Sequence, residues 1–320
     1  MRNSAPGVSI NVGVARNALT MNVPVPPQPR RQRAEGNRVT TESKEPDNGG
    51  LKIKDLPNST LRIEDLQAAS PFRWTSATRS HPGRVRQVNE DACLDQPEQG
   101  LWAVADGMGG HTLGDFASGL AVQALMDLPA TEDFEQRVSA AMQRLQEVNH
   151  RLRDEARWRE VPLIGTTIAV LLAAGGLCSC LWAGDSRVYL YRAGRLRQLT
   201  RDHNHLEAAR SQHISSSDDT LELPRANLVT RAIGAEDTLQ IDRVTVELLD
   251  GDIFLLCTDG LSNEVSELSI EQALLPGICS LACDALIDMA LERDARDNIT
   301  ALVARAEDLS STGQTIVRMR

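Results

Sequence analysis

Hydrophobic residues recur along the chain with two different spacings from residue 76 onward. Two long segments, Leu113–Leu128 and Phe134–Arg157, carry apolar residues every three or four positions, which predicts amphipathic helices. Shorter stretches rich in apolar and β-branched residues, bounded by Gly, Asp or Ser, predict strands. The predicted strands are Ala77–Val85, Leu101–Ala105, Thr166–Ala173, Leu177–Ala183, Val188–Arg192, Leu196–Leu199, Ile241–Leu248, Ile253–Cys257 and Ile299–Ala304. Two further helices are predicted over Ile270–Leu275 and Ser280–Arg293.

The order of these elements favours two sheets packed on one another with helices outside, because helix pairs separate two strand-rich blocks. The apolar stretch Ile164–Trp182 is long enough for a transmembrane helix. Its central Gly175-Gly176 pair and the polar exit at Asp185 instead predict two strands joined by a tight turn. We therefore expect no membrane insertion.

Acidic residues stand where several of the predicted strands end. Asp106, Asp185 and Asp259 each follow an apolar strand almost directly and lie beside a Gly or Ser. Two further acidic segments are Arg86–Asp91 and Arg296–Asn298. Clustered carboxylates at the ends of core strands are costly unless they meet positive charge. Hard divalent cations with oxygen ligands are the usual partners, so the sequence predicts an acidic pocket for Mg²⁺ or Mn²⁺.

Eight short motifs occur in a fixed order between residues 76 and 307. They read Arg86-x-x-Asn-Glu90-Asp91, Asp106-Gly-Met-Gly-Gly-His111, Gly165-Thr-Thr, Gly184-Asp-Ser-Arg, Leu199-Thr-x-Asp-His203, Thr230-Arg-Ala-Ile-Gly234, Thr258-Asp-Gly-Leu261 and Asp297-Asn-Ile-Thr300. Each alone is a common turn or loop signal. Together the eight resemble the metal-dependent protein Ser/Thr phosphatases, the PPM or type 2C family. The Asp-Gly-Met-Gly-Gly form resembles its bacterial branch, and the whole is similar to phosphatases paired with type VI secretion kinases.

The resemblance implies the fold class α+β, as a four-layer α/β/β/α sandwich in which helix pairs flank two central antiparallel sheets. It also implies a metal-binding set, which is Glu90, Asp91, Asp106, Gly107, Asp185, Asp259 and Asp297. Asp106, Asp259 and Asp297 would hold one ion, and Asp106 would bridge to a second ion that also takes the Gly107 carbonyl. Glu90 and Asp91 would act through metal-bound waters, and Asp185 would help to bind a third, weaker ion.

The implied reaction is hydrolysis of phosphoserine and phosphothreonine in proteins. Two ions, Mn²⁺ or Mg²⁺, lying about 3.5–4 Å apart would share a water and lower its pKa, and the resulting hydroxide would attack phosphorus directly. Arg86 would bind the phosphate. His111 and His203 are both candidates for protonating the leaving oxygen. The identity of the general acid stays open, because Met108 stands where animal members of the family carry a His, and a metal-bound water is a third candidate.

Residues 1–75 differ in composition from the rest of the chain. They contain 11 Lys and Arg against 7 Asp and Glu, so they carry +4 and the remainder carries −14 of the total −10. Low hydrophobicity with scattered Pro and Gly predicts a disordered N-terminal arm before a phosphatase domain at residues 76–307. A docking role around Leu56–Leu66 is the alternative. Residues 201–227 are expected to form a mobile flap and residues 308–320 a flexible tail.

The net charge of −10 argues against general nucleic-acid binding, which needs a basic face. The expected partners are a phosphorylated protein and a cognate bacterial Ser/Thr kinase or its targets. Six cysteines without Cys-x-x-Cys or zinc-like spacing predict buried reduced thiols and a cytoplasmic location. A non-catalytic phosphoprotein-binding relative is disfavoured because every expected acid is present. An enzyme for small phosphate esters is disfavoured because the chain has few aromatic residues for a closed, stacking pocket.

Overall fold

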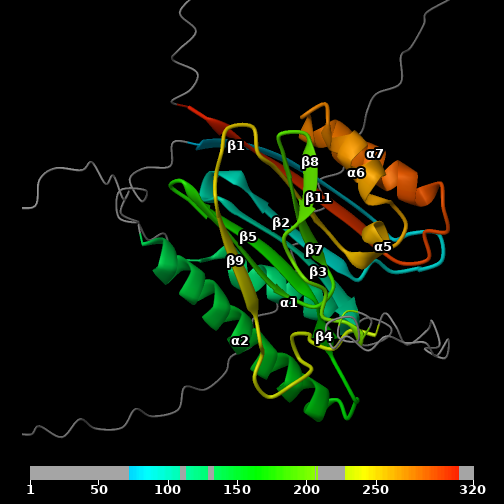
Figure 1. Cartoon of the computed structure of the whole chain (residues 1–320). Helices are drawn as coiled ribbons and strands as arrows, with labels where there is room; N and C mark the ends of the chain where they lie inside the picture. The colour runs from blue at the N-terminus through cyan, green and yellow to red at the C-terminus, as the bar shows by residue number, and fades with distance from the viewer. Residues whose placement is uncertain (1–71, 109–112, 129–132, 206, 208–227, 310–320) are drawn as a thin grey trace, which may run out of the picture. The chain divides into compact units, whose positions relative to one another are not determined.

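Two antiparallel β-sheets packed face to face form the centre of the computed structural model, which describes residues 72–108, 113–128, 133–205, 207 and 228–309 (Figure 1). The five-stranded sheet has the spatial order β1 (Phe72–His81), β11 (Ile299–Asp308), β10 (Ile253–Cys257), β7 (Arg187–Arg192) and β8 (Arg195–Gln198). The six-stranded sheet has the order β2 (Asp91–Gln96), β3 (Leu101–Met108), β5 (Ile168–Ala174), β6 (Leu177–Ala183) and β9 (Asp242–Glu247), with β4 (Gly165–Thr166) paired to β3. A short 3₁₀ turn, η2 (Pro97–Gln99), joins β2 to β3.

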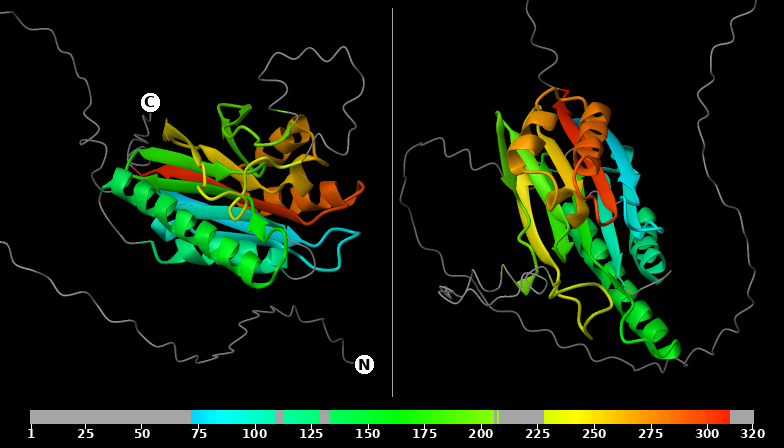
Figure 2. Two further views of the ribbon diagram at one scale, coloured as in Figure 1. Left: turned by 90° about the horizontal axis from the view of Figure 1, so that it is seen from below. Right: turned by 90° about the vertical axis from the view of Figure 1, so that its right-hand side faces the viewer.

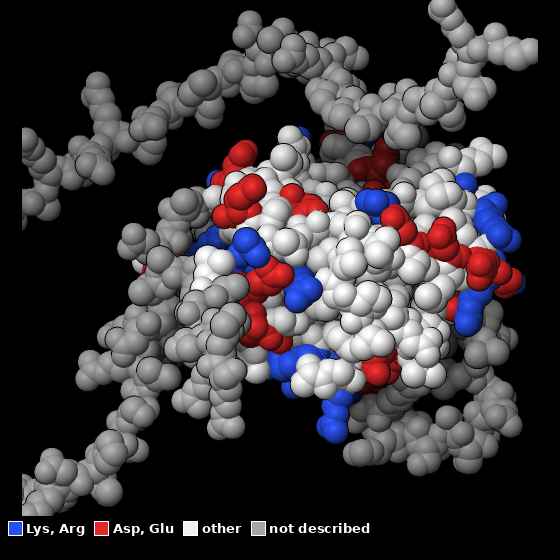
Figure 3. Space-filling view, turned by 90° about the horizontal axis from the view of Figure 1, so that it is seen from above, with Lys and Arg blue, Asp and Glu red and all other residues white. Residues whose placement is uncertain are grey.

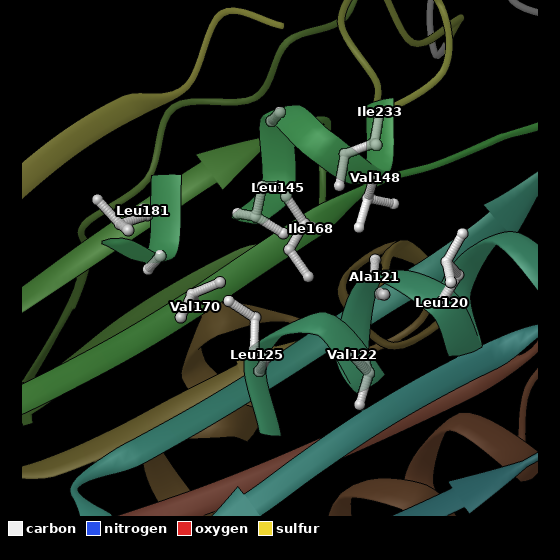
Figure 4. Packing of buried hydrophobic residues seen from close by; sticks show 14 of the residues in the cluster. Leu120, Ala121, Val122, Leu125, Leu145, Val148, Ile168, Val170, Leu181 and Ile233 are labelled. Carbon is white, nitrogen blue, oxygen red and sulfur yellow. The ribbon is translucent and has the colours of Figure 1, made fainter. Parts of the chain in front are cut away.

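Helices cover the outer face of each sheet. The long helices α1 (Leu113–Met126) and α2 (Phe134–Trp158) lie on the six-stranded sheet, where Leu125 and Leu145 pack near Ile168 of β5 (Figure 4). The helices α5 (Asp259–Ser262), α6 (Glu267–Leu274) and α7 (Cys279–Leu291) lie on the other sheet. Figure 2 shows α2 and the α6–α7 pair on opposite sides of the paired sheets. The predicted four-layer α/β/β/α sandwich is confirmed.

Alternating side chains divide the core into three layers. In β3, Leu101 and Ala103 face the α1–α2 layer, whereas Trp102 and Val104 face the space between the sheets. In β10, Phe254 faces that same inter-sheet space. Successive strand residues point to opposite faces, so strands covered on both sides must be apolar throughout. This explains why these strands are continuous hydrophobic runs in the sequence.

Aromatic residues gather in the inter-sheet layer, although the chain has few of them. The ring of Trp74 in β1 lies 4.5 Å from the ring of Trp102 in β3 and 6.0 Å from that of Phe254 in β10, measured between centroids. Aromatic pairs at such distances add to the stabilisation gained from burying their surface. Trp74 therefore joins the two sheets near the edge formed by β1.

Among the segments that differ from the predicted elements, two lie at the edges of the sheets. Residues 91–96 form β2, which was not predicted, because Asp-Ala-Cys-Leu-Asp-Gln has too few apolar residues to indicate a strand without its partner β3. The first strand begins at Phe72 and ends at His81, whereas Ala77–Val85 was predicted. Residues 72–75 of β1 pair with residues 305–308 of β11, so the ordered strands extend beyond the predicted limits of 76 and 307.

The apolar stretch Ile164–Trp182 forms strands, as predicted. Its β5 and β6 pair antiparallel, with Ala174 opposite Leu177, around Gly175 at φ +57°. No helix within the described ranges is long and apolar enough to cross a membrane. All six cysteines are free thiols, and five of them are buried. On the face shown in Figure 3, acidic and basic side chains form mixed groups around a wide uncharged surface.

Candidate metal centre and active site

Neighbouring strands bring the first group of site residues together. Asp91 begins β2 and Asp106 lies near the end of β3, and the register sets the two residues directly opposite one another. Opposed residues on antiparallel strands have their Cβ atoms about 4.5–5.5 Å apart. The Gly107 N–H donates to the Glu90 carbonyl at 3.2 Å, so the pairing between these two segments extends one residue beyond Asp91 and Asp106. Four of the predicted metal-binding residues therefore lie at one end of the six-stranded sheet.

The five-stranded sheet contributes two more acids at the same end. Asp259 is the first residue of α5, directly after β10, and Asp297 lies just before β11, the neighbour of β10. The hydroxyls of Thr258 and Thr300 donate to Asp91 Oδ2 at 2.9 and 2.7 Å. These bonds hold the ends of β10 and β11 against the start of β2, so acids from both sheets meet.

Asp185 joins this group through Thr167. It follows β6 after Gly184, whose φ of +119° is a backbone conformation that favours glycine. Thr167 Oγ1 accepts from the Asp106 N–H at 3.0 Å and lies 2.7 Å from Ser186 Oγ. The residue after Asp185 is thus tied to the strand that carries Asp106.

Burial and mutual repulsion raise the pKa values of these carboxyls. Burial, followed by repulsion from Asp259, raises the pKa of Asp106 well above its ordinary value. Burial also raises the pKa of Asp91 to about 7, against hydrogen bonds from two threonines that lower it. Burial and then Asp259 raise the pKa of Asp185 to about 7. Each carboxylate is destabilised by its neighbours, and a cation placed among them would relieve that repulsion.

The repulsion between carboxyls is clearest where Asp106 contacts Asp259. The pKa of Asp259 is raised by burial and by Asp297, and its contact with the Asp106 carboxyl acts in the opposite direction. Two carboxyls at hydrogen-bond separation repel each other unless a proton or a cation lies between them. The bridging role predicted for Asp106 requires this proximity to a second acid.

Three buried carboxylate oxygens in this group have no hydrogen-bond partner: Glu90 Oε1, Asp91 Oδ1 and Asp259 Oδ1. An unpaired buried carboxylate oxygen is costly, and oxygens of this kind are the preferred ligands of Mg²⁺ and Mn²⁺. Among the described residues, no three acidic, histidine or cysteine side chains already form a complete set of metal ligands. The donor set therefore fits a hard divalent cation in its chemistry, while the carboxylates do not yet converge on one point.

Two glycines allow the backbone segments of the site to approach closely. A Cβ at Gly107 would lie 2.0 Å from the Gly114 carbonyl oxygen, and a Cβ at Gly260 would lie 2.0 Å from the Asn298 carbonyl oxygen. Real Cβ atoms do not approach oxygen so closely. The Asp-Gly pairs in the sequence are therefore needed for packing beside the acids, not only for turning the chain.

Arg86 reaches the acidic group from the loop between β1 and β2. Its Nη2 lies 2.8 Å from Asp297 Oδ2, and both side chains are partly exposed. Asn298 holds this loop in place, because its Oδ1 accepts from the Glu90 N–H at 2.8 Å and its Nδ2 donates to the Pro82 and Val88 carbonyls at 3.0 Å. This anchoring role of Asn298 was not predicted, since its partners are more than two hundred residues away in sequence.

His203 is buried in internal contacts. Its Nδ1 accepts from the Gly184 N–H at 3.2 Å, its backbone N–H donates to the Gly184 carbonyl at 2.9 Å, and its Nε2 lies 3.2 Å from Asp242 Oδ2. Burial lowers the pKa of His203. The ring lies beside a polar cavity of about 200 Å³ that Arg201, Arg231 and neighbouring residues line. These contacts favour a role in positioning Gly184 and Asp185.

Arg187 forms an ion pair with a neighbouring acid, because its Nη2 lies 2.7 Å from Asp202 Oδ2. His111, the other candidate for the general acid, lies outside the described residues. The same holds for most of the segment predicted as a flap, for residues 1–71 and for residues 310–320.

A family model, a curated relative and two solved structures resemble this chain. The family model described as Protein phosphatase 2C matches residues 79–288. The serine/threonine phosphatase stp of Listeria monocytogenes serotype 4b is 35% identical over 250 residues, which cover 74% of this chain and 97% of that protein. The solved structure of PppA, described as a key regulatory component of T6SS in Pseudomonas aeruginosa, is 44% identical with a TM-score of 0.69, covering 73% of this chain and 97% of that chain. The catalytic domain of the serine/threonine protein phosphatase PstP, in complex with two manganese ions, is 31% identical with a TM-score of 0.65, covering 74% and 100%.

The four-layer fold with acids gathered at one end of both sheets defines a class of metal-dependent phosphoprotein phosphatases. The chain belongs to the protein phosphatase 2C family, in its bacterial branch. It is a serine/threonine protein phosphatase, and its substrates are phosphorylated proteins.

Proposed function

We propose that the acidic group holds two divalent cations, Mn²⁺ or Mg²⁺, and that these drive the phosphatase reaction. Asp106, Asp259 and Asp297, with the Gly107 carbonyl, would hold them, with Asp106 shared between both. Glu90 and Asp91 would complete the site, and Asp185 would help to hold a third, weaker ion. The observation that supports this most is the contact of buried, mutually repelling carboxyls that leave three oxygens unpartnered.

Bound cations supply positive charge for the phosphate and a water whose pKa is lowered. Arg86 binds the phosphate beside them. Its guanidinium has five N–H donors in a planar fork, so it can take two phosphate oxygens while its contact with Asp297 keeps it at the site. Thr167 and Asn298 keep the segments that carry Asp106 and Glu90 in position through the bonds described above.

The proton for the leaving oxygen has no assigned side-chain donor among the described residues. Both ring nitrogens of His203 have internal partners, so we assign it to positioning the Gly184–Asp185 segment. His111 stays a candidate. The alkoxide that leaves from phosphothreonine needs this proton more than the phenolate that leaves from an aryl phosphate. A loss of the general acid should therefore slow hydrolysis of phosphothreonine more than hydrolysis of an aryl phosphate.

We propose further that the enzyme opposes a bacterial Ser/Thr kinase, in the regulation of a type VI secretion system. The similarity to PppA of Pseudomonas aeruginosa supports this assignment. The six free cysteines support a reducing, cytoplasmic location. Deleting the gene should raise phosphothreonine on components of the secretion machinery, measured by comparing phosphoprotein profiles. Unchanged profiles for those components would contradict the secretion assignment and leave the phosphatase activity standing.

The metal assignment is tested by hydrolysis of a phosphothreonine peptide, with phosphotyrosine and nucleotide controls. We expect activity to disappear after treatment with a chelator and to return with added Mn²⁺. Hydrolysis that resists the chelator would contradict the proposed site. Equal turnover of the nucleotide would contradict the assignment to protein substrates.

A further inference from the structure

The two oxygens of the Asp91 carboxylate have opposite surroundings. Oδ2 accepts hydrogen bonds from two buried hydroxyls, Thr300 Oγ1 at 2.7 Å and Thr258 Oγ1 at 2.9 Å. Oδ1 is also buried but has no partner. Hydrogen bonds from neutral donors stabilise the ionised carboxyl and fix its rotation. One oxygen is thus saturated while the other stays available to a ligand.

The direction of each hydrogen bond around Oδ2 follows from the number of protons. A threonine hydroxyl has one proton, and an ionised carboxylate only accepts, so both threonines donate to Asp91. Thr300 Oγ1 must then accept from Ser80 Oγ, 2.8 Å away, and Ser80 Oγ accepts from the Asn89 side-chain amide at 2.8 Å. Thr258 Oγ1 accepts from the Thr300 backbone N–H at 3.0 Å. Every proton in this chain of bonds points toward Asp91.

These residues come from both sheets. Ser80 lies in β1, Thr300 in β11 and Thr258 directly after β10, all in the five-stranded sheet, whereas Asp91 begins β2 of the other sheet. Thr258 is also the neighbour of Asp259 in sequence. The hydroxyls therefore link the pair Asp91–Asp106 to the sheet that carries Asp259.

We propose that Thr258, Thr300 and Ser80 are positioning residues for the cation site, because they hold Asp91 with Oδ1 available to it and fix the separation between the acids of the two sheets. This inference rests on the proposed metal centre. It assigns to the hydroxyls a share of the affinity for the cation, beyond their contribution to folding. Partners that orient metal-binding side chains are worth about 10- to 100-fold in affinity at many sites.

Thr258→Val and Thr300→Val remove each hydroxyl and keep the branched shape of the side chain. The matched control is Thr78→Val, because Thr78 lies on the same face of β1 as Ser80, and its hydroxyl contacts Cys93 Sγ in β2 and the Ala301 carbonyl, both at 3.4 Å. All three variants lose a hydroxyl between β1, β2 and β11. Only the first two lose a donor to Asp91.

The measurement is calorimetric titration of Mn²⁺ into the metal-free full chain, with the thermal unfolding midpoint recorded in parallel. We expect Thr258→Val and Thr300→Val to raise the Kd for Mn²⁺ about tenfold, Thr300→Ser to restore it, and Thr78→Val to leave it unchanged. Ser80→Ala, at the exposed rim, should give a smaller increase in Kd and covers the case in which a valine variant does not fold. A purely structural role would lower the unfolding midpoints of the valine variants and leave the Kd values equal.

Two negative results are distinguishable. If Mn²⁺ binds the valine and Ser80→Ala variants as tightly as the wild type, while Asp106→Asn abolishes binding, the inference about the hydroxyls is wrong and the metal centre stands. If the wild-type chain itself takes up no Mn²⁺, the proposed centre is wrong and this inference falls with it.

Discussion

At the scale of single residues, Asp106 is the carboxyl whose charge matters most. It lies opposite Asp91 and in contact with Asp259, and it is partly buried. Its ionised form is destabilised in the protein without metal, yet that charge is what would hold the cations. Activity and stability should therefore respond to its removal with opposite signs.

Asp106→Asn keeps the shape of the side chain and removes the charge. We expect kcat/KM on a phosphothreonine peptide to fall about a thousandfold, or about 4 kcal/mol of transition-state stabilisation. The unfolding midpoint of the metal-free variant should equal or exceed that of the wild type, because one repelling charge is gone. Asp288→Asn, an exposed position on α7, makes the same charge change away from the site and should alter neither quantity. Full turnover by Asp106→Asn would contradict the assignment.

The raised pKa values of Asp91 and Asp185, each about 7, give a pH dependence of stability. The folded, metal-free protein binds protons at these carboxyls more tightly than the unfolded chain, whose carboxyls have ordinary pKa values near 3.9. Their contribution is fully present below that ordinary value and is lost as the pH rises through about 7.

We therefore expect the unfolding midpoint of the chelator-treated protein to fall between about pH 5 and pH 8, measured by calorimetry. The decrease should be smaller in Asp91→Asn, which isolates that carboxyl from other titrating groups. Saturating Mn²⁺ should reverse much of the decrease, because a cation stabilises the ionised forms. A midpoint that rises over this range without metal would contradict the predicted direction.

At the scale of elements, the packing of α1 against the site depends on one of its two interior glycines. A Cβ at Gly114 would lie 2.6 Å from the Glu90 carboxyl carbon and 2.9 Å from the Gly107 carbonyl oxygen. A Cβ at Gly119, five residues along the same helix, would meet nothing within 4 Å. The same substitution thus has opposite consequences at two nearby positions.

Gly114→Ala should displace Glu90 and Gly107 and so lower activity. It should also lower the free energy of unfolding by about 1–3 kcal/mol, as overpacking does. Gly119→Ala should raise the free energy of unfolding by about 0.5–1 kcal/mol, because alanine loses less conformational freedom in a helix. Chemical denaturation and peptide assays measure both. Equal effects of the two substitutions would show that the close approach of α1 to the site is unimportant.

The sequence was most informative where an element is buried on a regular face. Strand β10 was predicted with its observed limits of Ile253–Cys257, and α2 extends one residue beyond the predicted end at Arg157. Strand β2 was missed because its extended form depends on pairing with β3, and half of its own residues are polar. Local spacing carries no information about such tertiary pairing.

Within the site, too, some residues are recognisable from local sequence and others only from the fold. The acids were recognisable because each follows a strand within a motif, whereas Thr258 and Thr300 read as ordinary β-branched residues. Their hydrogen bonds to Asp91 span 167 and 209 residues of sequence. Only the packing of one sheet on the other reveals that they share an acceptor.

At the scale of the whole molecule, every described acid of the site lies between residues 90 and 297, after the predicted N-terminal arm. A chain that begins at residue 71 keeps all of β1. We expect it to hydrolyse 4-nitrophenyl phosphate with a kcat/KM within about twofold of the full chain, since this small ester needs only the catalytic centre. A large loss would mean that residues 1–70 contribute to that centre.

A chain that begins at residue 76 is the matched comparison, because it follows the boundary predicted from the sequence. It loses Trp74, which packs on Trp102 and Phe254, and Arg73, whose Nη2 lies 2.6 Å from Glu307 Oε2. Trp74 is partly buried, so its removal should cost less than the about 3–5 kcal/mol lost with a fully buried aromatic side chain. We expect a lower unfolding midpoint than in the chain that begins at residue 71, and equal midpoints would support the predicted boundary at 76.

The acids of the site come from two different sheets, so the distances between these acids depend on the thickness of the core between the sheets. Asp91 and Asp106 belong to one sheet, and Asp259 and Asp297 border the other. Side chains such as Phe254 and Trp102 act as spacers that set how far apart the two halves stand. Changing the size of these spacers should therefore alter metal affinity and turnover from inside the protein, with every carboxylate left in place.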